Sequence, residues 1–349
     1  MKQYKYKWTR WVCGNRHGRD AHIRLLDSRH EGTIPADRSS PAGADAMATA
    51  AKVEKAPIAN PMQVNIFAKD EKGFLAPIAI QIEKSSDVAK KALEYMVEGG
   101  PSQGQLPSGF TSILPKGTEV RSININKEQK LATVDFSNAF TDYNLQDERK
   151  ILEAVTWTLT SFGSVDQVKI RVEGKDLKEM PVGQTPLDGP LTRAMGINLE
   201  KPENVEYGQS TPVTLYFLNQ NQASYTYYVP VTRFVKRTDN IAQAVIEQLI
   251  AGPDEKKGLT AVMAPGAEPL KVSKADDVIT VDFSDKMLGP DKKAPAEALK
   301  AVVLSLTENI GTSSKVQILV NGDAKVSATD NMNYSKPVTR PLNVNQVKS

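Results

Sequence analysis

Apolar residues follow two alternating spacings from residue 61 onward. Every second residue is apolar around Val64 and Ile66 and again from Ile78 to Ile82, which is typical of β-strands with one buried face. In SSDVAKKALEYMVEGGP, residues 85–101, the apolar positions recur at spacings of three and four, as they do on one face of a helix. The Gly-Gly-Pro at the end of this stretch is expected to stop the helix.

The same two spacings continue to residue 172. Alternation predicts strands at 119–125 and 131–136, joined by the polar turn NKEQK. Apolar residues at helical spacing predict a second helix from about Leu145 to Phe162. The segment VKIRV at 168–172 then predicts one further strand.

The pentapeptide TVDFS occurs twice, at 133–137 and at 280–284, and its surroundings repeat in the same order. The second set of predicted elements comprises strands at 212–218 and 227–232, a helix within 238–253, a strand at 278–284, a helix at 296–310 and a strand at 316–322. Landmarks in the two sets are 147 to 152 residues apart. A collinear order at nearly constant offsets indicates a tandem duplication.

This pattern predicts an α+β protein of two tandem homologous domains, each with the order β-β-α-β-β-α-β. Each domain is expected to be a mixed sheet with two helices on one face. The predicted boundaries are 1–59 for a solvated, disordered N-terminal arm, 60–195 for the first domain, 196–211 for a linker and 212–345 for the second domain. Domains of about 145 residues bury roughly 68–70% of their unfolded surface, so each could hold its own core.

Composition limits the classes of function. Residues 1–56 carry 11 lysines and arginines against 6 acidic residues, whereas the rest of the chain carries 33 against 35. A nearly neutral body does not indicate a nucleic-acid surface. No stretch approaches the ~18 consecutive apolar residues of a membrane span. The single cysteine, Cys13, excludes a disulfide framework within the chain.

Candidate catalytic and metal-binding residues are few. The aspartates of the two TVDFS copies, Asp135 and Asp282, are interpreted as structural caps of the following turn, because no histidine follows Arg29-His30 and no partner acid recurs. A Ser-His-Asp site in the body is therefore excluded by composition. Cys13, His17, His22 and His30 fit no common zinc spacing. We therefore predict no catalytic, cofactor or metal site and no enzymatic activity.

Four aromatic residues are candidates for a binding surface. Trp157 lies at helical spacing beside small residues and is predicted to be in the core or at a domain interface. Tyr225, Tyr227 and Tyr228 form an aromatic strand for which cross-strand packing is the favoured interpretation. A partner-binding edge is the alternative, because exposed aromatic patches often mark interfaces.

Several motifs together resemble the GerMN-domain family of spore germination proteins, and the resemblance covers roughly residues 62–345. They are SSDVAKKALEYMVEGGP, GFTSILPKGTEV, TVDFSNAF, ILEAVTWTLTSF, VKIRVEGKDLKEMPVGQTPLDGPLTRAMGINLE, YYVPVTR and VNG. The resemblance implies an α-β-β-α-β core similar to the ring-building motifs of secretion-system and sporulation-channel proteins. It also implies a non-enzymatic role in assembling the transenvelope complex that joins mother cell and forespore, needed for spore formation and germination.

The resemblance further implies an extracytoplasmic lipoprotein whose partners are other sporulation envelope proteins, with homo-oligomers as a further possibility. Members of the family carry an apolar run before a lipidated cysteine, and Cys13 has no such run before it. Lipidation is therefore not carried over to Cys13. One hypothesis is that residues 1 to about 46 come from a different frame or start, because family-like composition resumes near Met47.

Two other classes of function stay open at this point. A peptidoglycan-binding or cortex-modifying spore-wall protein would be retained by purified cell wall. A cytosolic protein with a basic arm for nucleic acid would bind DNA in a salt-sensitive way that depends on residues 1–56.

Overall fold

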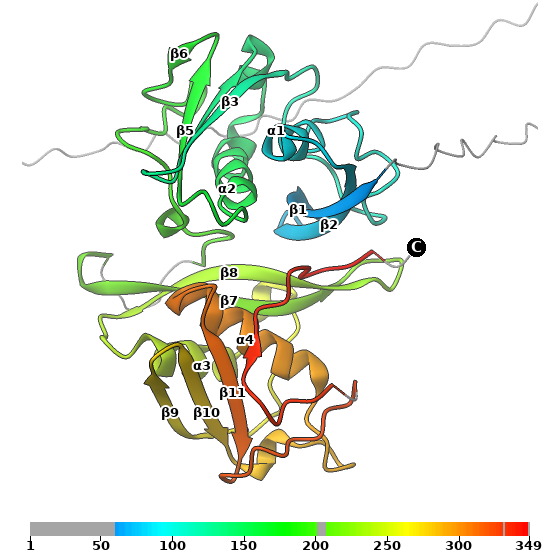
Figure 1. The fold of residues 1–349 in the computed structure, drawn as a ribbon, viewed down its shortest axis with the longest axis vertical. Helices are drawn as coiled ribbons and strands as arrows, with labels where there is room; N and C mark the ends of the chain where they lie inside the picture. The colour runs from blue at the N-terminus through cyan, green and yellow to red at the C-terminus, as the bar shows by residue number, and fades with distance from the viewer. Residues whose placement is uncertain (1–59, 201–206, 331, 348–349) are drawn as a thin grey trace, which may run out of the picture. The chain divides into compact units, whose positions relative to one another are not determined.

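The computed structural model describes residues 60–200, 207–330 and 332–347. The predicted N-terminal arm, with Cys13, His17, His22 and His30, lies outside the described residues. The two repeats follow one another along the rest of the chain (Figure 1). Among the described residues, no helix is long and apolar enough to cross a lipid bilayer.

The first repeat contains six strands and two α-helices in the described part. They are β1 Pro61–Lys69, β2 Leu75–Glu83, α1 Val88–Glu94, β3 Val120–Asn126, β4 Leu131–Phe136, α2 Glu148–Leu159, β5 Gln167–Val172 and β6 Lys175–Asp176. The predicted order is confirmed. A 3-10 turn at Leu145–Asp147 takes the place of the first predicted residues of α2.

The second repeat has the same order. Its elements are β7 Ser210–Gln220, β8 Thr226–Lys236, α3 Ile241–Ala251, β9 Pro269–Ala275, β10 Val278–Phe283, α4 Ala296–Ile310, β11 Lys315–Val320 and β12 Val338–Thr339. The α+β class and the two tandem domains are therefore confirmed, as is the α-β-β-α-β order from α1 to β5 and from α3 to β11.

Each repeat has three layers, because its first two strands form a hairpin that stays apart from the mixed sheet. The sheet orders are β3-β4-β5-β6 and β12-β11-β10-β9, with β4 parallel to β5 and β10 parallel to β11. The hairpins β1-β2 and β7-β8 are separate two-stranded sheets. The helices cover one face of the mixed sheet, as expected, and contact the hairpin on their other side (Figure 1).

This position explains why α2 is buried on nearly all sides, although its sequence includes polar residues. Of its 12 residues, 10 are buried, which is typical of a helix enclosed between layers. The Oγ1 of Thr158 accepts a hydrogen bond from the backbone N–H of Phe67 in β1, at 3.1 Å. In the second repeat, Ser305 of α4 accepts from the N–H of Tyr216 in β7, at 3.0 Å. Buried hydroxyls thus satisfy donors at the free edge of each hairpin.

The two TVDFS aspartates have the structural role that was predicted, but at a different turn. Asp135 Oδ1 accepts from the N–H of Gly174 at 2.8 Å, and Asp282 Oδ1 accepts from the N–H of Gly322 at 3.0 Å. Both glycines lie in the tight turn after the neighbouring parallel strand and have positive φ, 76° and 79°. Each aspartate therefore ties its own strand to the turn that ends the next strand, and the expectation that it caps the following turn is wrong.

Replacing either aspartate should destabilise the protein. We expect Asp135→Ala and Asp282→Ala each to lower the free energy of unfolding by about 1–2 kcal/mol, because a hydrogen bond to a charged acceptor is lost. Urea unfolding of the full chain measures the change. Asp142→Ala, at an exposed aspartate of the first repeat, is the control and should stay within about 0.5 kcal/mol of the unmodified protein. Equal effects of all three variants would contradict the assignment.

Candidate functional site

The two candidate aspartates of the TVDFS copies do not come together in the structure. Asp135 and Asp282 lie on equivalent strands of different repeats, each bonded to its own glycine. Among residues 60–200, 207–330 and 332–347, no group of three histidine, cysteine or acidic side chains could hold a metal ion. Buried polar residues instead gather where the two hairpins face each other, and this interface between the repeats is the candidate functional site.

Two asparagines link the repeats in an equivalent way. Asn198 accepts from the N–H of Leu75 and donates through Nδ2 to the carbonyls of Leu75 and Pro230, at 2.9, 2.7 and 2.7 Å. Asn345 accepts from the N–H of Tyr228 and donates to the carbonyls of Tyr228 and Pro77, at 2.7, 2.8 and 2.9 Å. Each asparagine therefore joins β2 to β8. Because the set of partners is exchanged between the repeats, the interface has an approximate twofold relation.

The segments that carry these asparagines are themselves a repeat. PLTRAMGIN at 190–198 and PVTRPLNVN at 337–345 are 147 residues apart and share proline, threonine, arginine and the final asparagine. The strands and helices of the two repeats reveal the duplication in the sequence, but their periodicity does not extend to these two tails, 190–198 and 337–345, which were not predicted. The signal was available in the repeated P-x-T-R and in the matching asparagine.

The arginines of the two tails converge on one carboxylate. Arg193 bonds the Thr160 hydroxyl and Arg340 bonds the Thr307 hydroxyl, each at the last turn of the second helix of its own repeat. Both guanidinium groups also bind Glu308 of α4, Arg193 through Nη1 at 2.5 Å and Arg340 through Nη2 at 2.8 Å. The side chain of Glu308 is only 4% exposed, so this ion pair joins the two tails inside the protein.

Three donors keep Glu308 ionised despite its burial. Burial alone would raise the pKa of this carboxyl, but the charges of Arg193 and Arg340 and the hydrogen bonds from Arg193 and Tyr216 lower it to about 2. The hydroxyl of Tyr216 donates to Glu308 Oε2 at 2.9 Å. A buried carboxylate with two cationic partners stabilises the folded state only as long as it stays charged.

A second polar group lies at the tips of the two hairpins. Asp70 Oδ2 accepts from Asn219 Nδ2 at 2.8 Å and from the Tyr227 hydroxyl at 2.7 Å. Lys72 donates to Asn219 Oδ1 at 2.7 Å and to the Gly258 carbonyl at 2.9 Å. Burial and the hydrogen bond to Asp70 raise the pKa of the Tyr227 hydroxyl, so this group stays protonated and acts as a donor.

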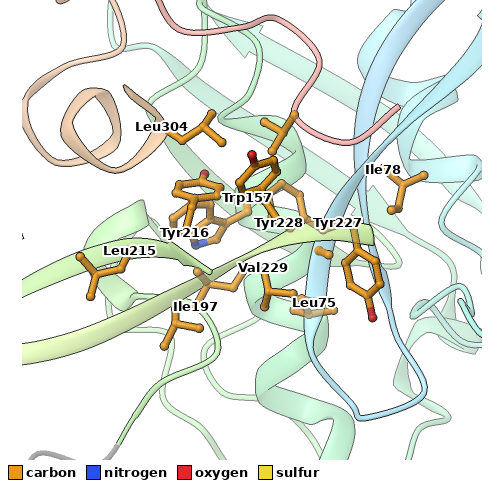
Figure 2. Close-up of a cluster of buried hydrophobic side chains, with 14 of the residues drawn as sticks. Leu75, Ile78, Trp157, Ile197, Leu215, Tyr216, Tyr227, Tyr228, Val229 and Leu304 are labelled. Atoms are coloured by element: carbon orange, nitrogen blue, oxygen red, sulfur yellow. The ribbon is translucent and has the colours of Figure 1, made fainter. Parts of the chain in front are cut away.

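Apolar side chains fill the space between these polar groups. Figure 2 shows Trp157, Tyr216, Tyr228 and Leu304 in one buried cluster with residues of both hairpins. Trp157 is fully buried, lies under the Arg193 guanidinium at 4.4 Å and donates from Nε1 to the Gly196 carbonyl at 3.1 Å. The prediction of a core or interface position for Trp157 is confirmed.

Two of the three tyrosines singled out in the sequence, Tyr225 just before β8 and Tyr227 within it, contact the first repeat. Tyr227 and Tyr225 lie edge-on to Phe110 of the first repeat, with ring centroids at 4.7 and 6.3 Å. Tyr228 is 7% exposed and is bonded to Asn345 through its N–H. Packing is therefore the right interpretation for these tyrosines, but much of it is against the other repeat.

Comparison with known proteins agrees with this architecture. The sequence profile of the Germane family, described as "Sporulation and spore germination", matches residues 65–178 and 214–326, one segment in each repeat. The chain belongs to the Germane family. A curated relative, spore germination protein GerM of Bacillus subtilis (strain 168), is 38% identical over 322 residues, which is 87% of this chain and 86% of that protein.

Solved structures of the same relative are also similar. The tandem GerMN domains of the sporulation protein GerM from Bacillus subtilis match with a TM-score of 0.76 and 37% identity, covering 82% of this chain and 100% of that one. The first GerMN domain of that protein matches with a TM-score of 0.37 and 45% identity, covering 38% of this chain and 98% of that one. Membership of the Germane family, together with the tandem match, confirms the expected family and places the chain among proteins of sporulation and spore germination.

The Glu308 ion pair makes the stability of this Germane protein sensitive to acid. The pKa of Glu308 is about 2 in the folded state against an ordinary value of 4.5, so its contribution is complete above pH 4.5 and is lost as pH falls toward 2. At neutral pH, Glu308→Gln should lower the free energy of unfolding by about 3–5 kcal/mol, because two partly buried arginines lose their buried anion.

The matched measurement is urea unfolding between pH 7 and pH 2.5 for the unmodified protein, Glu308→Gln and Glu128→Gln. The difference between the unmodified protein and Glu308→Gln should shrink below pH 4.5. Glu128 lies at an exposed turn of the first repeat, so its variant should follow the unmodified protein at every pH. A constant difference across the whole range would contradict the role of the Glu308 charge.

The two asparagines should be equally sensitive to substitution. Asn198→Ala and Asn345→Ala each leave one N–H and two carbonyls at the interface without their partner, so each should cost about 2–4 kcal/mol of unfolding free energy. Asn345→Asp keeps the acceptor for Tyr228 but removes both donors, and should also be destabilising. Asn138→Ala, at an exposed position, is the control. A large cost at only one of the two sites would show that the contacts are not energetically equivalent.

Proposed function

We propose that this chain is a non-enzymatic structural assembly factor of the transenvelope complex between mother cell and forespore. The observation that carries the proposal is the interface between the repeats, which fixes two similar domains in one unit through two Asn198/Asn345 linkages and the Glu308 ion pair. A rigid pair of similar domains suits a scaffold that holds partners at a fixed spacing. Membership of the Germane family supports the sporulation context.

The chemistry of the described residues supports a structural role. They include no histidine. The acidic side chains singled out above bond groups of the same chain: Asp135 and Asp282 bond backbone amides, Asp70 bonds Asn219 and Tyr227, and Glu308 bonds two arginines and Tyr216. The α-β-β-α-β order, which the ring-building motif shares, supports docking through sheet edges and helix faces. We further propose an extracytoplasmic location with a lipid anchor, as in the family that the sequence resembles.

The outer edges of the mixed sheets are the surfaces on which we expect sporulation partners, or further copies of the chain, to dock. The edge strands β3 and β9 are the first strands of their sheets and are largely exposed. An exposed edge strand offers backbone donors and acceptors to an added strand. β3 contains only one charged residue, Arg121, whereas β9 contains Lys271 and Lys274, so β3 is the better template.

Recovery of partners from sporulating cells tests this proposal. Full-length tagged protein should retain specific envelope proteins, and Asn124→Lys on β3 should reduce that retention several-fold, because a charge on an edge strand opposes pairing. Ser273→Lys is the equivalent change on β9. Gln222→Lys is the control, because it lies between β7 and β8, outside both mixed sheets; all three positions are exposed. Thermal unfolding should be unchanged by the three variants.

Two results of the recovery experiment would contradict the proposal. Retention that is unaffected by either edge variant would remove the edges from the docking surface. Saccharide-dependent retention of the protein on purified peptidoglycan, with no envelope protein recovered, would favour a wall-binding function in place of assembly.

A further inference from the structure

A cavity of about 480 Å³ lies beside the interface between the repeats and is lined by residues of both. Gly73 and Phe74 come from the hairpin of the first repeat, and Arg149, Lys150 and Glu153 come from α2. Asn198 ends the first tail, and Leu199 and Glu200 follow it. Lys257 belongs to a 3-10 turn of the second repeat. A volume of this size is in the range of small-molecule sites.

The cavity lining contains three cationic side chains and two carboxylates. Arg149, Lys150 and Lys257 supply three positive charges from two different repeats. Lys257 Nζ donates to the Leu199 carbonyl at 3.1 Å, which leaves its charge uncompensated at that contact. Within the described part of the chain, Lys150 forms no ion pair, and its Nζ lies against Gly73, where an added Cβ would be only 3.1 Å away.

The two carboxylates of the lining are already used. Glu153, with a side chain 3% exposed, accepts from Arg149 Nε at 2.7 Å and from the N–H of Asn198 at 3.1 Å. Glu200 is held by the guanidinium of Arg233 at 2.6 Å. Burial raises the pKa of the Glu153 carboxyl, although Arg149 opposes the rise. The charge of Lys150 also opposes the rise in the pKa of Glu153, but neither carboxylate forms an ion pair with Lys150 or Lys257; their ion pairs are with Arg149 and Arg233.

Apolar surface accompanies these charges. Phe74 and Leu199 line the same cavity as the lysines. A ligand with one anionic group and an apolar portion would bind the ammonium groups by charge-assisted hydrogen bonds and bury its apolar part on Phe74 and Leu199. We propose that this cavity binds a small organic anion, a carboxylate or a phosphate monoester, between the two repeats through Lys150 and Lys257.

This site is independent of the assembly role proposed above, because it does not involve the edges of β3 or β9. A ligand that contacts both repeats should stabilise the interface between them, and therefore the folded state of the whole chain. Binding should therefore raise the temperature of thermal unfolding of the full chain as well as produce a titration signal.

Calorimetry and amide chemical shifts of the full chain, with defined probes, test the site. N-acetylphenylalanine supplies a carboxylate and an apolar ring, its amide supplies the same ring without charge, and phenyl phosphate supplies the phosphate monoester. We expect N-acetylphenylalanine or phenyl phosphate to bind at millimolar concentrations, with shifts at Gly73 and Leu199, and the amide to bind at least about tenfold more weakly. The tighter of the two anions identifies the ligand class.

Two variants and one control locate the site. Lys150→Gln and Lys257→Gln should each weaken binding of the anionic probe about tenfold, which is the usual effect of losing one charge-assisted contact. Lys127→Gln, at an exposed lysine of the first repeat, should leave binding unchanged. Equal binding of the amide, binding that survives both lysine variants, or no binding of either anion would each overturn the proposal. Thermal unfolding of the variants without ligand confirms that they are folded.

Discussion

The structure depends on a hairpin in each repeat that is apolar on both faces. In β2 the residues Leu75–Ile80 are buried without interruption, and in β8 the residues Tyr227–Thr232 are buried in the same way. One face of each hairpin packs on the helices of its own repeat, but those helices cannot cover the other face. Because β2 and β8 contact each other, each repeat supplies the missing cover for the other. Exposed, these faces would form a large apolar patch, which soluble proteins avoid.

When β2 and β8 are buried against each other, some of their backbone N–H and C=O groups have no strand partner for a hydrogen bond. β2 and β8 do not form a ladder with each other, so their facing amides and carbonyls need other partners. Asn198 and Asn345 supply them, since an amide side chain offers both a donor and an acceptor. Arg193 and Arg340 lie five residues before the asparagines in the same tails and bond the helices and Glu308.

The elements of the fold were predictable because their periodicity is local. The spacing of apolar residues located each strand and helix, and the repeated TVDFS revealed the duplication. The separate hairpin layer was not predicted, although the nearly unbroken apolar runs LAPIAI and YYVPV are the signature of strands buried on both faces. The tail residues Asn198 and Asn345 have no periodic pattern, because their role depends on strands more than 100 residues away. The partner of Asp135 was missed for the same reason, since it follows a neighbouring strand.

Differences between the repeats make their pairing specific. Asp70 and Asn219 occupy equivalent positions and bond each other, whereas two first repeats facing each other would bring two aspartates together. Glu308 of the second repeat corresponds to Ser161 of the first, at the offset of 147 residues. An interface between two first repeats would therefore contain both arginines and no carboxylate. An interface between two second repeats would contain two carboxylates close together. Pairing of a first repeat with a second is thus favoured in two ways: these contacts form between unlike repeats, and two like repeats would bring unpaired or like charges together. The approximate twofold relation supplies the geometry of the interface, and these two substitutions select which partner completes it.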